Sequence, residues 1–236
     1  MKIEILYPEI ANLFGEIGHQ MFLQLLFPKA QIIRTQLLAR PTFLDEQVDL
    51  IFMGPTSENS QEKIIQVLRP LKEKIEERIH AGDRFFFTGN AMEVLGTSIL
   101  TDEGRSIQGL GIFEMESRRQ MMHRLTELYV GMYDDLQVVG TKTQFTQNYP
   151  LDPETFPYLM KTVRGFGMNK QLEGEGIHFH HFVGTYVLGP LLILNPLFTE
   201  RLFEEWGIPV TLPHRNTLLE AYDIRLKGYL NPKSYA

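Results

Sequence analysis

The sequence contains no cysteine and only one tryptophan among its 236 residues. The lack of cysteine excludes disulfides, thiolate metal ligands and a thiol nucleophile from the chemistry of this chain. Basic residues are also fewer than acidic ones: 23 Lys and Arg stand against 29 Asp and Glu, which gives a formal net charge of −6. Because no basic tract offsets this balance, we expect no nucleic-acid partner.

Long hydrophobic runs are missing as well. The longest apolar region, residues 182–194, is too short to span a bilayer and is interrupted by Gly184, Gly189 and Pro190. Near the first residue, Glu4 lies inside the only apolar stretch and no small-residue cleavage site follows, so we expect no signal peptide. The sequence therefore predicts no membrane association and a cytoplasmic location.

The remaining composition is ordinary for a folded protein, with 43% hydrophobic and 22% charged residues. No stretch has the composition of a linker between two domains, so we predict a single domain over residues 1–236. We expect no cofactor.

Apolar runs and helix-spaced stripes alternate through the first half of the chain. Residues 3–7, 48–53 and 85–88 are predicted strands, while residues 14–25 and 64–79 show apolar residues at helical spacing, the second stripe being kinked or split by Pro70. Such alternation predicts a mostly parallel sheet covered by helices on both faces, a three-layer α/β/α domain of the α/β class.

The second half of the chain changes character. Residues 125–132 and 136–145 are predicted antiparallel strands, which extend the domain, and residues 145–157 form a predicted loop. Residues 178–188 are predicted to form one further strand, ending at Gly189. Two helices are predicted to follow, the first starting at Pro196 after an Asn195 N-cap.

The stretch Arg84–Gly96, RFFFTGNAMEVLG, is a predicted strand, sharp turn and helix, with the helix opening at Ala91–Leu95. In α/β enzymes such an elbow presents a nucleophile beside the free N–H groups of the helix. Gly89 holds the turn position here. Glycine brings no nucleophile but suits the positive φ of a strained turn, so we predict that the turn is kept and its chemistry lost. The glycines that mark three strand ends, Gly54, Gly89 and Gly189, are expected to converge.

Five segments resemble a known family, the class I glutamine amidotransferases of the cobyric acid synthase type. The likeness is greatest to the glutaminase subunit of lipid II isoglutaminyl synthase, an enzyme that amidates a peptidoglycan precursor. The segments that carry the resemblance are LYPEIANLFGEIGH (Leu6–His19), TGNAMEVLG (Thr88–Gly96), IQGLGIFE (Ile107–Glu114), GFGMN (Gly165–Asn169) and VGTYVLGPLLILNP (Val183–Pro196).

The resemblance implies a catalytic pair that this chain lacks. In the family a cysteine at the elbow attacks the carboxamide of glutamine, and a histidine before a later Gly-Pro is its base. Gly89 stands at the cysteine position and Leu188 at the histidine position, so no catalytic residue is intact. The family also has a glutamine near Glu93.

We therefore predict a catalytically inactive glutamine amidotransferase-like protein, connected with the cell wall through peptidoglycan. Its expected role is a binding or regulatory subunit for a Mur-ligase-like partner, with a homo-oligomer or a stand-alone ligand sensor as alternatives. Backbone N–H groups near Gly54 and after Gly89 could hold an anion, and Asn90 and Glu93 complete the predicted binding residues for a glutamine-like small ligand.

An active amidohydrolase or glutaminase subunit with a non-cysteine nucleophile is the alternative reading. Thr88 precedes the elbow, but strand alternation turns it away from the position of Gly89. Ser57 and Ser60 lie in the loop after Gly54, where we interpret them as a polar loop and helix N-cap.

Histidines give the one pattern suggestive of a metal. On a strand His178 and His180 would share a face, with Glu173 or Glu175 as a third ligand. Histidine clusters near a sheet edge more often bond to backbone or water, so we predict no metal site.

Overall fold

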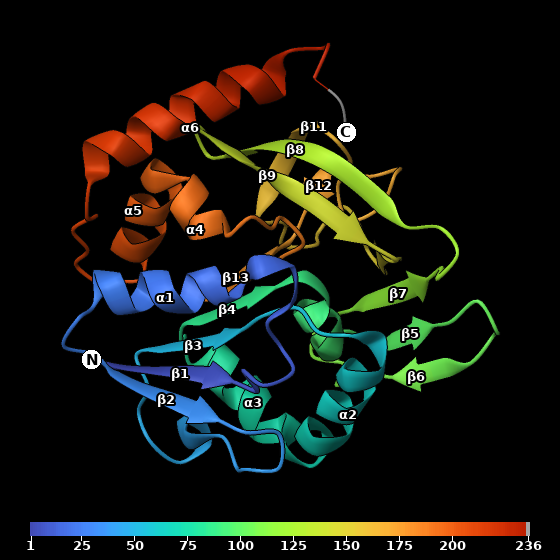
Figure 1. Cartoon of the computed structure of the whole chain (residues 1–236). Helices are drawn as coiled ribbons and strands as arrows, with labels where there is room; N and C mark the ends of the chain where they lie inside the picture. The colour runs from blue at the N-terminus through green and yellow to red at the C-terminus, as the bar shows by residue number, and fades with distance from the viewer. Residues whose placement is uncertain (235–236) are drawn as a thin grey trace.

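A computed structural model describes residues 1–234 of the chain (Figure 1). Its central sheet has six strands in the order β13-β14-β4-β3-β1-β2. Five of them run parallel, and β13 pairs antiparallel with β14 at one edge. The strands are β1 (Lys2–Leu6), β2 (Gln31–Thr35), β3 (Leu50–Met53), β4 (Phe85–Thr88), β13 (Ile177–Phe179) and β14 (Phe182–Thr185).

Alternation along β4 sends side chains to two separate cores. Phe85 and Phe87 pack with the apolar residues of α2 (Glu58–Leu68) and α3 (Lys72–His80). Phe86 packs on the opposite face with α1 (Ile17–Leu26), α4 (Leu191–Leu194) and α5 (Pro196–Glu205). Figure 1 shows the sheet between these two groups of helices. The prediction of three α/β/α layers is confirmed.

Pro70 splits the long apolar stripe as predicted. Residues Arg69–Leu71 form a 3₁₀ turn between α2 and α3, and both helices still bury isoleucines on the same side of the sheet. Proline causes the break because it has no N–H to donate and its ring clashes with the preceding turn.

Two smaller sheets extend the domain, one mixed and one antiparallel throughout, and the second contains the predicted antiparallel pair. One has the order β10-β7-β5-β6 and the other β12-β11-β8-β9. Their strands are β5 (Ser98–Leu100), β6 (Ser106–Gln108), β7 (Met115–Arg119), β8 (Leu125–Tyr133), β9 (Leu136–Gln144), β10 (Thr146–Pro150), β11 (Met160–Arg164) and β12 (Gly174–Glu175). Across β8 and β9 lies α6 (Arg215–Leu230), at the top of Figure 1. No helix within residues 1–234 is long and apolar enough to cross a membrane.

Four local predictions need correction. The helix at Ala91–Leu95 is part of a 3₁₀ helix over Gly89–Leu95, hereafter the elbow helix. Residues 145–157 contain strand β10, which pairs with β7. Residues 178–188 are not one strand, because the chain reverses at His180, whose φ is +52°, and returns as β14. Asn195 does not cap α5 with its side chain, since it bonds to both backbone groups of Val139 instead.

Candidate functional site

A cavity of about 220 Å³ opens at the carboxyl ends of β3 and β4. Ligand sites of open α/β sheets lie at this edge, because the loops that follow parallel strands meet there. Its wall comes from the loop after β1, the loop after β3, the elbow helix, the residue before β8, the junction of β9 and β10, and the segment after β14. The wall residues are Leu13, Phe14, Pro55–Glu58, Gly89, Asn90, Glu93, Arg124, residues 143–146, Tyr186 and Leu188.

Gly89 begins the elbow helix directly after β4 and has a φ of +61°. This is the left-handed region, which glycine adopts without the strain that a Cβ would bring. Space excludes a side chain as well. A Cβ built on Gly89 would lie 2.5 Å from the Cβ of Pro55, far inside normal contact.

Leu188, in the segment after β14, lines the same cavity. Its backbone forms a two-way bridge with Thr141: the Leu188 N–H donates to the Thr141 carbonyl at 2.9 Å, and the reverse bond measures 3.0 Å. The structure thus brings Gly89 and Leu188 to one cavity, in the part of the chain it describes.

Gly54 and Gly189 both lie beside Glu16, outside the cavity wall as described for residues 1–234. Gly54 is buried at the end of β3, where an added Cβ would lie 2.6 Å from the carbonyl oxygen of Ala11. Gly189 donates its N–H to Glu16 Oε1 at 3.4 Å. Neither glycine is part of the cavity wall within residues 1–234.

Asn90 fastens the elbow helix to the loop after β3. Its Oδ1 accepts from the Thr56 N–H at 2.9 Å, and its Nδ2 donates to the Thr56 carbonyl at 2.8 Å. The Thr56 N–H, one of the backbone donors expected to hold an anion, is therefore already bonded.

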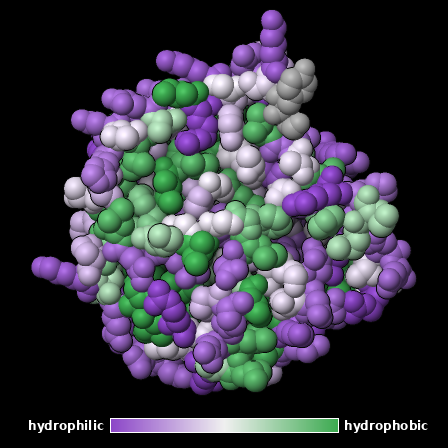
Figure 2. All heavy atoms as spheres, viewed as in Figure 1, coloured by the Kyte–Doolittle hydropathy of each residue, from purple (hydrophilic) through white to green (hydrophobic). Residues whose placement is uncertain are grey.

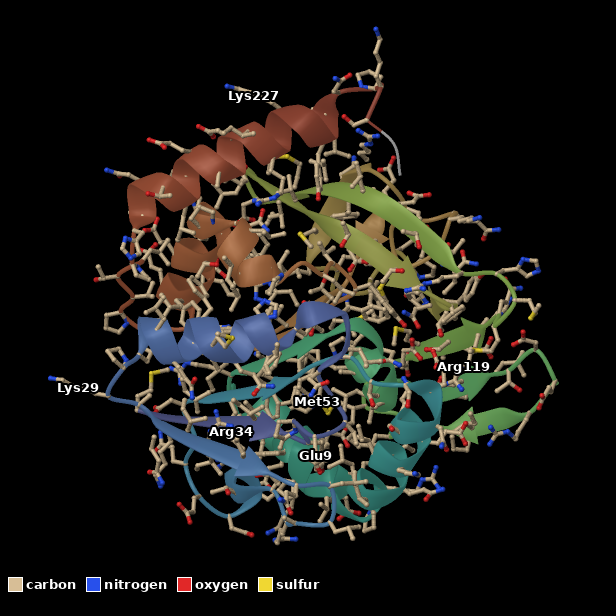
Figure 3. All side chains as sticks on the ribbon, viewed as in Figure 1. Glu9, Lys29, Arg34, Met53, Arg119 and Lys227 are labelled. Atoms are coloured by element: carbon tan, nitrogen blue, oxygen red, sulfur yellow. The ribbon has the colours of Figure 1, made fainter. Side chains whose placement is uncertain are left out.

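Glu93 belongs to the elbow helix, lines the cavity and is 1% exposed. Its Oε2 accepts from Gln61 Nε2 at 2.9 Å, and Gln61 Oε1 accepts from Arg119 Nη2 at 2.6 Å. Figure 3 labels Arg119 on β7, beside α2. The other carboxylate oxygen, Oε1, has no hydrogen-bond partner among the described residues.

Burial raises the pKa of Glu93 to about 7, because a carboxylate removed from water loses its hydration. Gln61, the positive charge of Arg119 and the nearby Thr146 hydroxyl oppose that rise, while Glu58 adds to it. Two further wall residues also hold buried polar atoms without partners inside residues 1–234, namely Gln144 through Oε1 and Tyr186 through its hydroxyl.

Sequence reasoning missed four of these residues: Gln61, Arg119, Gln144 and Tyr186. One signal was available for Arg119. It ends the run Met115–Arg119, whose alternate residues Met115, Ser117 and Arg119 are the buried ones. An inward-facing arginine on a strand indicates a buried carboxylate or amide partner.

Of the candidate substitute nucleophiles, Thr88 lies outside the cavity wall and Ser57 lies in it. Thr88 is 0% exposed and is not part of the described cavity wall. His19, a buried histidine of α1, has both nitrogens engaged: Nδ1 with Glu16 Oε2 at 2.8 Å, and Nε2 as acceptor of the Leu192 N–H at 3.1 Å. Ser57 caps α2 by accepting the Ser60 N–H, as interpreted from the sequence.

The histidines of the β13 turn do not form a metal site. His178 stacks on Tyr133 with a ring separation of 5.8 Å, whereas the His180 ring packs beside Phe179. Glu175 is 0% exposed and bonds to Lys142, Thr185 and the Tyr186 N–H. Among residues 1–234, no three His, Asp or Glu side chains gather closely enough to hold a metal ion.

The chain has a class I glutamine amidotransferase-like fold. A crystal structure of a glutamine amidotransferase matches 87% of this chain and 99% of its own length with a TM-score of 0.58 at 13% identity. The structure of PurLQS from Thermotoga maritima matches 95% of this chain and 98% of that chain with a TM-score of 0.55 at 9% identity. Identities this low establish the fold alone, and they confirm the fold predicted above.

Two relatives narrow the comparison. The chain is 27% identical over 197 residues to the glutamine-hydrolyzing lipid II isoglutaminyl synthase subunit GatD of Staphylococcus aureus, covering 82% of this chain and 79% of the relative. It is 24% identical over 228 residues to the subunit of the same name from Streptococcus pneumoniae, covering 93% and 87%. No family model matches the chain. The protein is therefore a GatD-like glutamine amidotransferase homologue without cysteine.

Proposed function

We propose that this protein is a non-hydrolysing subunit that has lost glutamine cleavage and acts by binding. The observation that carries the proposal is that Gly89 and Leu188, which stand where the family resemblance places the cysteine and the histidine, line one cavity. Amide cleavage by this route needs a thiolate to form the acyl-enzyme and a base to generate the thiolate. Glycine and leucine supply neither group.

The packing around Gly89 supports the same reading. Pro55 fills the space in which a nucleophile would begin, and Gly89 tolerates this contact because it has no Cβ. The alternative of a non-cysteine nucleophile gains no support from Thr88, which is fully buried outside the described cavity wall. Ser57 does line the cavity, but its hydroxyl is bonded to Ser60, where it accepts the N–H and donates to the Ser60 hydroxyl.

Exposed apolar side chains near the cavity support binding of a partner. Leu13 and Phe14 at the cavity rim and three residues of α1 are exposed by 38 to 64%, although all five are large and apolar: Leu13, Phe14, Ile17, Met21 and Leu25. The α1 members are four residues apart, so they form one stripe on the helix. We call the five residues the α1 apolar face. Apolar side chains gather over the position of α1 in Figure 2.

Exposed apolar patches of this kind mark protein interfaces. Both relatives are named as subunits, and the α1 apolar face continues directly from the cavity rim. We therefore assign this face to a Mur-ligase-like partner of peptidoglycan synthesis, in the cytoplasm. A second copy of the chain is the competing occupant.

Co-expression with the Mur-ligase-like protein from the same genome, followed by size-exclusion chromatography with light scattering, tests the assignment. Leu25→Glu places a charge in the α1 apolar face, and we expect it to abolish the complex. Leu38→Glu is the matched control, because Leu38 is 90% exposed outside that face. A complex that survives Leu25→Glu, or a homodimer that only Leu25→Glu dissociates, would contradict the assignment.

A further inference from the structure

Three side chains of the cavity wall each hold a buried polar atom that has no hydrogen-bond partner within residues 1–234. Glu93 Oε1 and Gln144 Oε1 are buried and, in the described chain, without partners. The Tyr186 hydroxyl is the third such atom. Buried polar atoms without partners destabilise a fold, so three of them around one cavity favour a bound molecule that supplies hydrogen-bond donors.

The charges around Glu93 indicate the charge of the molecule that the cavity would bind. The only cation that acts on Glu93 from the protein interior, Arg119, reaches it through Gln61 and also lies 3.6 Å from Glu62. Glu93 therefore has no direct counter-ion within residues 1–234. A buried carboxylate is stabilised far more by a cation in contact with it than by a neutral donor.

An anion is disfavoured in the same place. Glu93 and Glu58 both line the wall, and the Thr56 N–H is occupied by Asn90. Arg124, the basic residue of the wall, is exposed at the rim, where its Nε donates to Thr143 Oγ1 at 3.0 Å. The interior of the cavity is thus acidic and its rim is basic.

We propose that this cavity binds the primary ammonium group of a small aliphatic amine, with Glu93 as its counter-ion and Gln144 and Tyr186 as further acceptors. An ammonium group carries three N–H donors and no acceptor, which matches the unpartnered atoms of the wall. The volume of about 220 Å³ leaves room for the alkyl chain. The proposal rests on the proposed loss of glutamine cleavage at this cavity, but it does not depend on a protein partner.

Binding of n-butylammonium chloride, followed by ligand-observed NMR titration of the full chain, tests the proposal. Butyramide is the control probe, because it has a similar length and no charge. We expect n-butylammonium to bind, and butyramide and L-glutamine to bind at least tenfold more weakly.

The pH profile adds a second readout. An alkylammonium group stays protonated between pH 6 and pH 8, as a lysine does, so the change over this range reports the protein. With a Glu93 pKa of about 7, the ionised fraction rises from about 9% to about 91%, and the affinity is expected to rise about tenfold. Glu58 raises the pKa of Glu93, whereas the positive charge of Arg119 lowers it.

Two variants test which carboxylate of the cavity wall binds the amine. Glu93→Gln keeps the shape of the side chain and is expected to remove both the binding and its pH dependence, with a thermal melt confirming that the variant folds. Glu58→Gln is expected to weaken binding less. Loss in Glu58→Gln with retention in Glu93→Gln, equal binding of butyramide, or no binding of the amine at pH 8 would each overturn the proposal. None of these outcomes bears on ammonia release or partner binding, so the two proposals fail separately.

Discussion

Pro55 packs against Gly89 at the point where a side chain would leave the elbow. A Cβ on Gly89 would lie 2.5 Å from Pro55 Cβ and 3.4 Å from Pro55 Cγ. The loop after β3 therefore packs directly against the turn after β4. A cysteine could return to position 89 only if this loop moved, so the missing nucleophile is built into the packing as well as into the sequence.

Gly89→Cys and Gly89→Ala should both lower the melting temperature. A Cβ at positive φ costs about 1–2 kcal/mol, and overlap with Pro55 adds an amount of similar order. Gly104→Ala is the matched control, since Gly104 has a φ of +78° and nothing within 4 Å of an added Cβ. Urea unfolding of the three variants should show a larger loss at position 89 than at position 104.

Removing Pro55 Cβ tests the overlap itself. In a double-mutant cycle, Pro55→Gly should recover part of the stability that Gly89→Ala loses, because the two changes act on the same contact. Additive losses would show that the backbone angle alone is responsible.

The stability of the protein should fall as pH rises from 5 to 7. Burial raises the pKa of Glu93 from its usual 4.5 to about 7, so the folded state keeps this proton over a range in which the unfolded chain has lost it. The stabilisation is complete below pH 4.5 and is lost as pH passes 7, by roughly 3 kcal/mol at about 1.4 kcal/mol per pKa unit.

Urea unfolding at pH 5, 6, 7 and 8 measures this decline. In Glu93→Gln the decline should be absent, since the amide does not titrate, and the variant should be more stable than the original chain at pH 8. Glu154→Gln, an exposed carboxylate, serves as the control and should keep the decline. A parallel decline in Glu93→Gln would assign the pH dependence to another group.

Lys142 and Glu175 form a buried ion pair that holds β9 to β12. Both are 0% exposed and their charged atoms are 2.8 Å apart, while Lys142 Nζ also donates to the carbonyls of Phe166 and Gly167. Lys142→Met should cost about 3–5 kcal/mol, because it leaves Glu175 charged without its partner. Adding Glu175→Gln should return part of that loss. Thermal and urea unfolding of the two variants decide between this coupling and simple additivity.

The double variant Gly89→Cys/Leu188→His should release little or no ammonia from glutamine. Pro55 crowds the new thiol, and Glu93 places a carboxyl group in the cavity wall near the position at which the family resemblance implies a neutral glutamine. A colorimetric ammonia assay on folded protein checks this. Brisk hydrolysis would show that the glutamine site is preserved. The proposal that the cavity no longer supports glutamine cleavage would then be wrong apart from the two missing side chains.

Local patterns were enough to predict the parts of the fold that alternate along the chain. Three phenylalanines in succession indicated a strand buried on both faces, and β4 is such a strand, with Phe86 directed to one core and its neighbours to the other. The Gly89 turn and its positive φ followed from the same stretch. Pro70 fixed the break between α2 and α3.

Contacts between distant residues were beyond such patterns. The unpartnered oxygen of Glu93 depends on where Gln61 and Arg119 lie, and these residues are 32 and 58 positions apart from their partners. Strand β10 was missed because Thr146–Pro150 is polar and ends in proline, and only its pairing with β7 makes it a strand. Likewise, the reversal at His180 depends on a left-handed residue that does not have to be glycine.

The most direct test of the central claim is a glutaminase measurement on the purified full chain, alone and with the Mur-ligase-like protein present. Ammonia and glutamate released from L-glutamine are followed over protein concentration, with Thr88→Ala as the control for a substitute nucleophile. We predict no release above the protein-free background in either mixture. Release that increases with protein concentration and disappears in Thr88→Ala would contradict the account, because it would show that glutamine cleavage persists without cysteine.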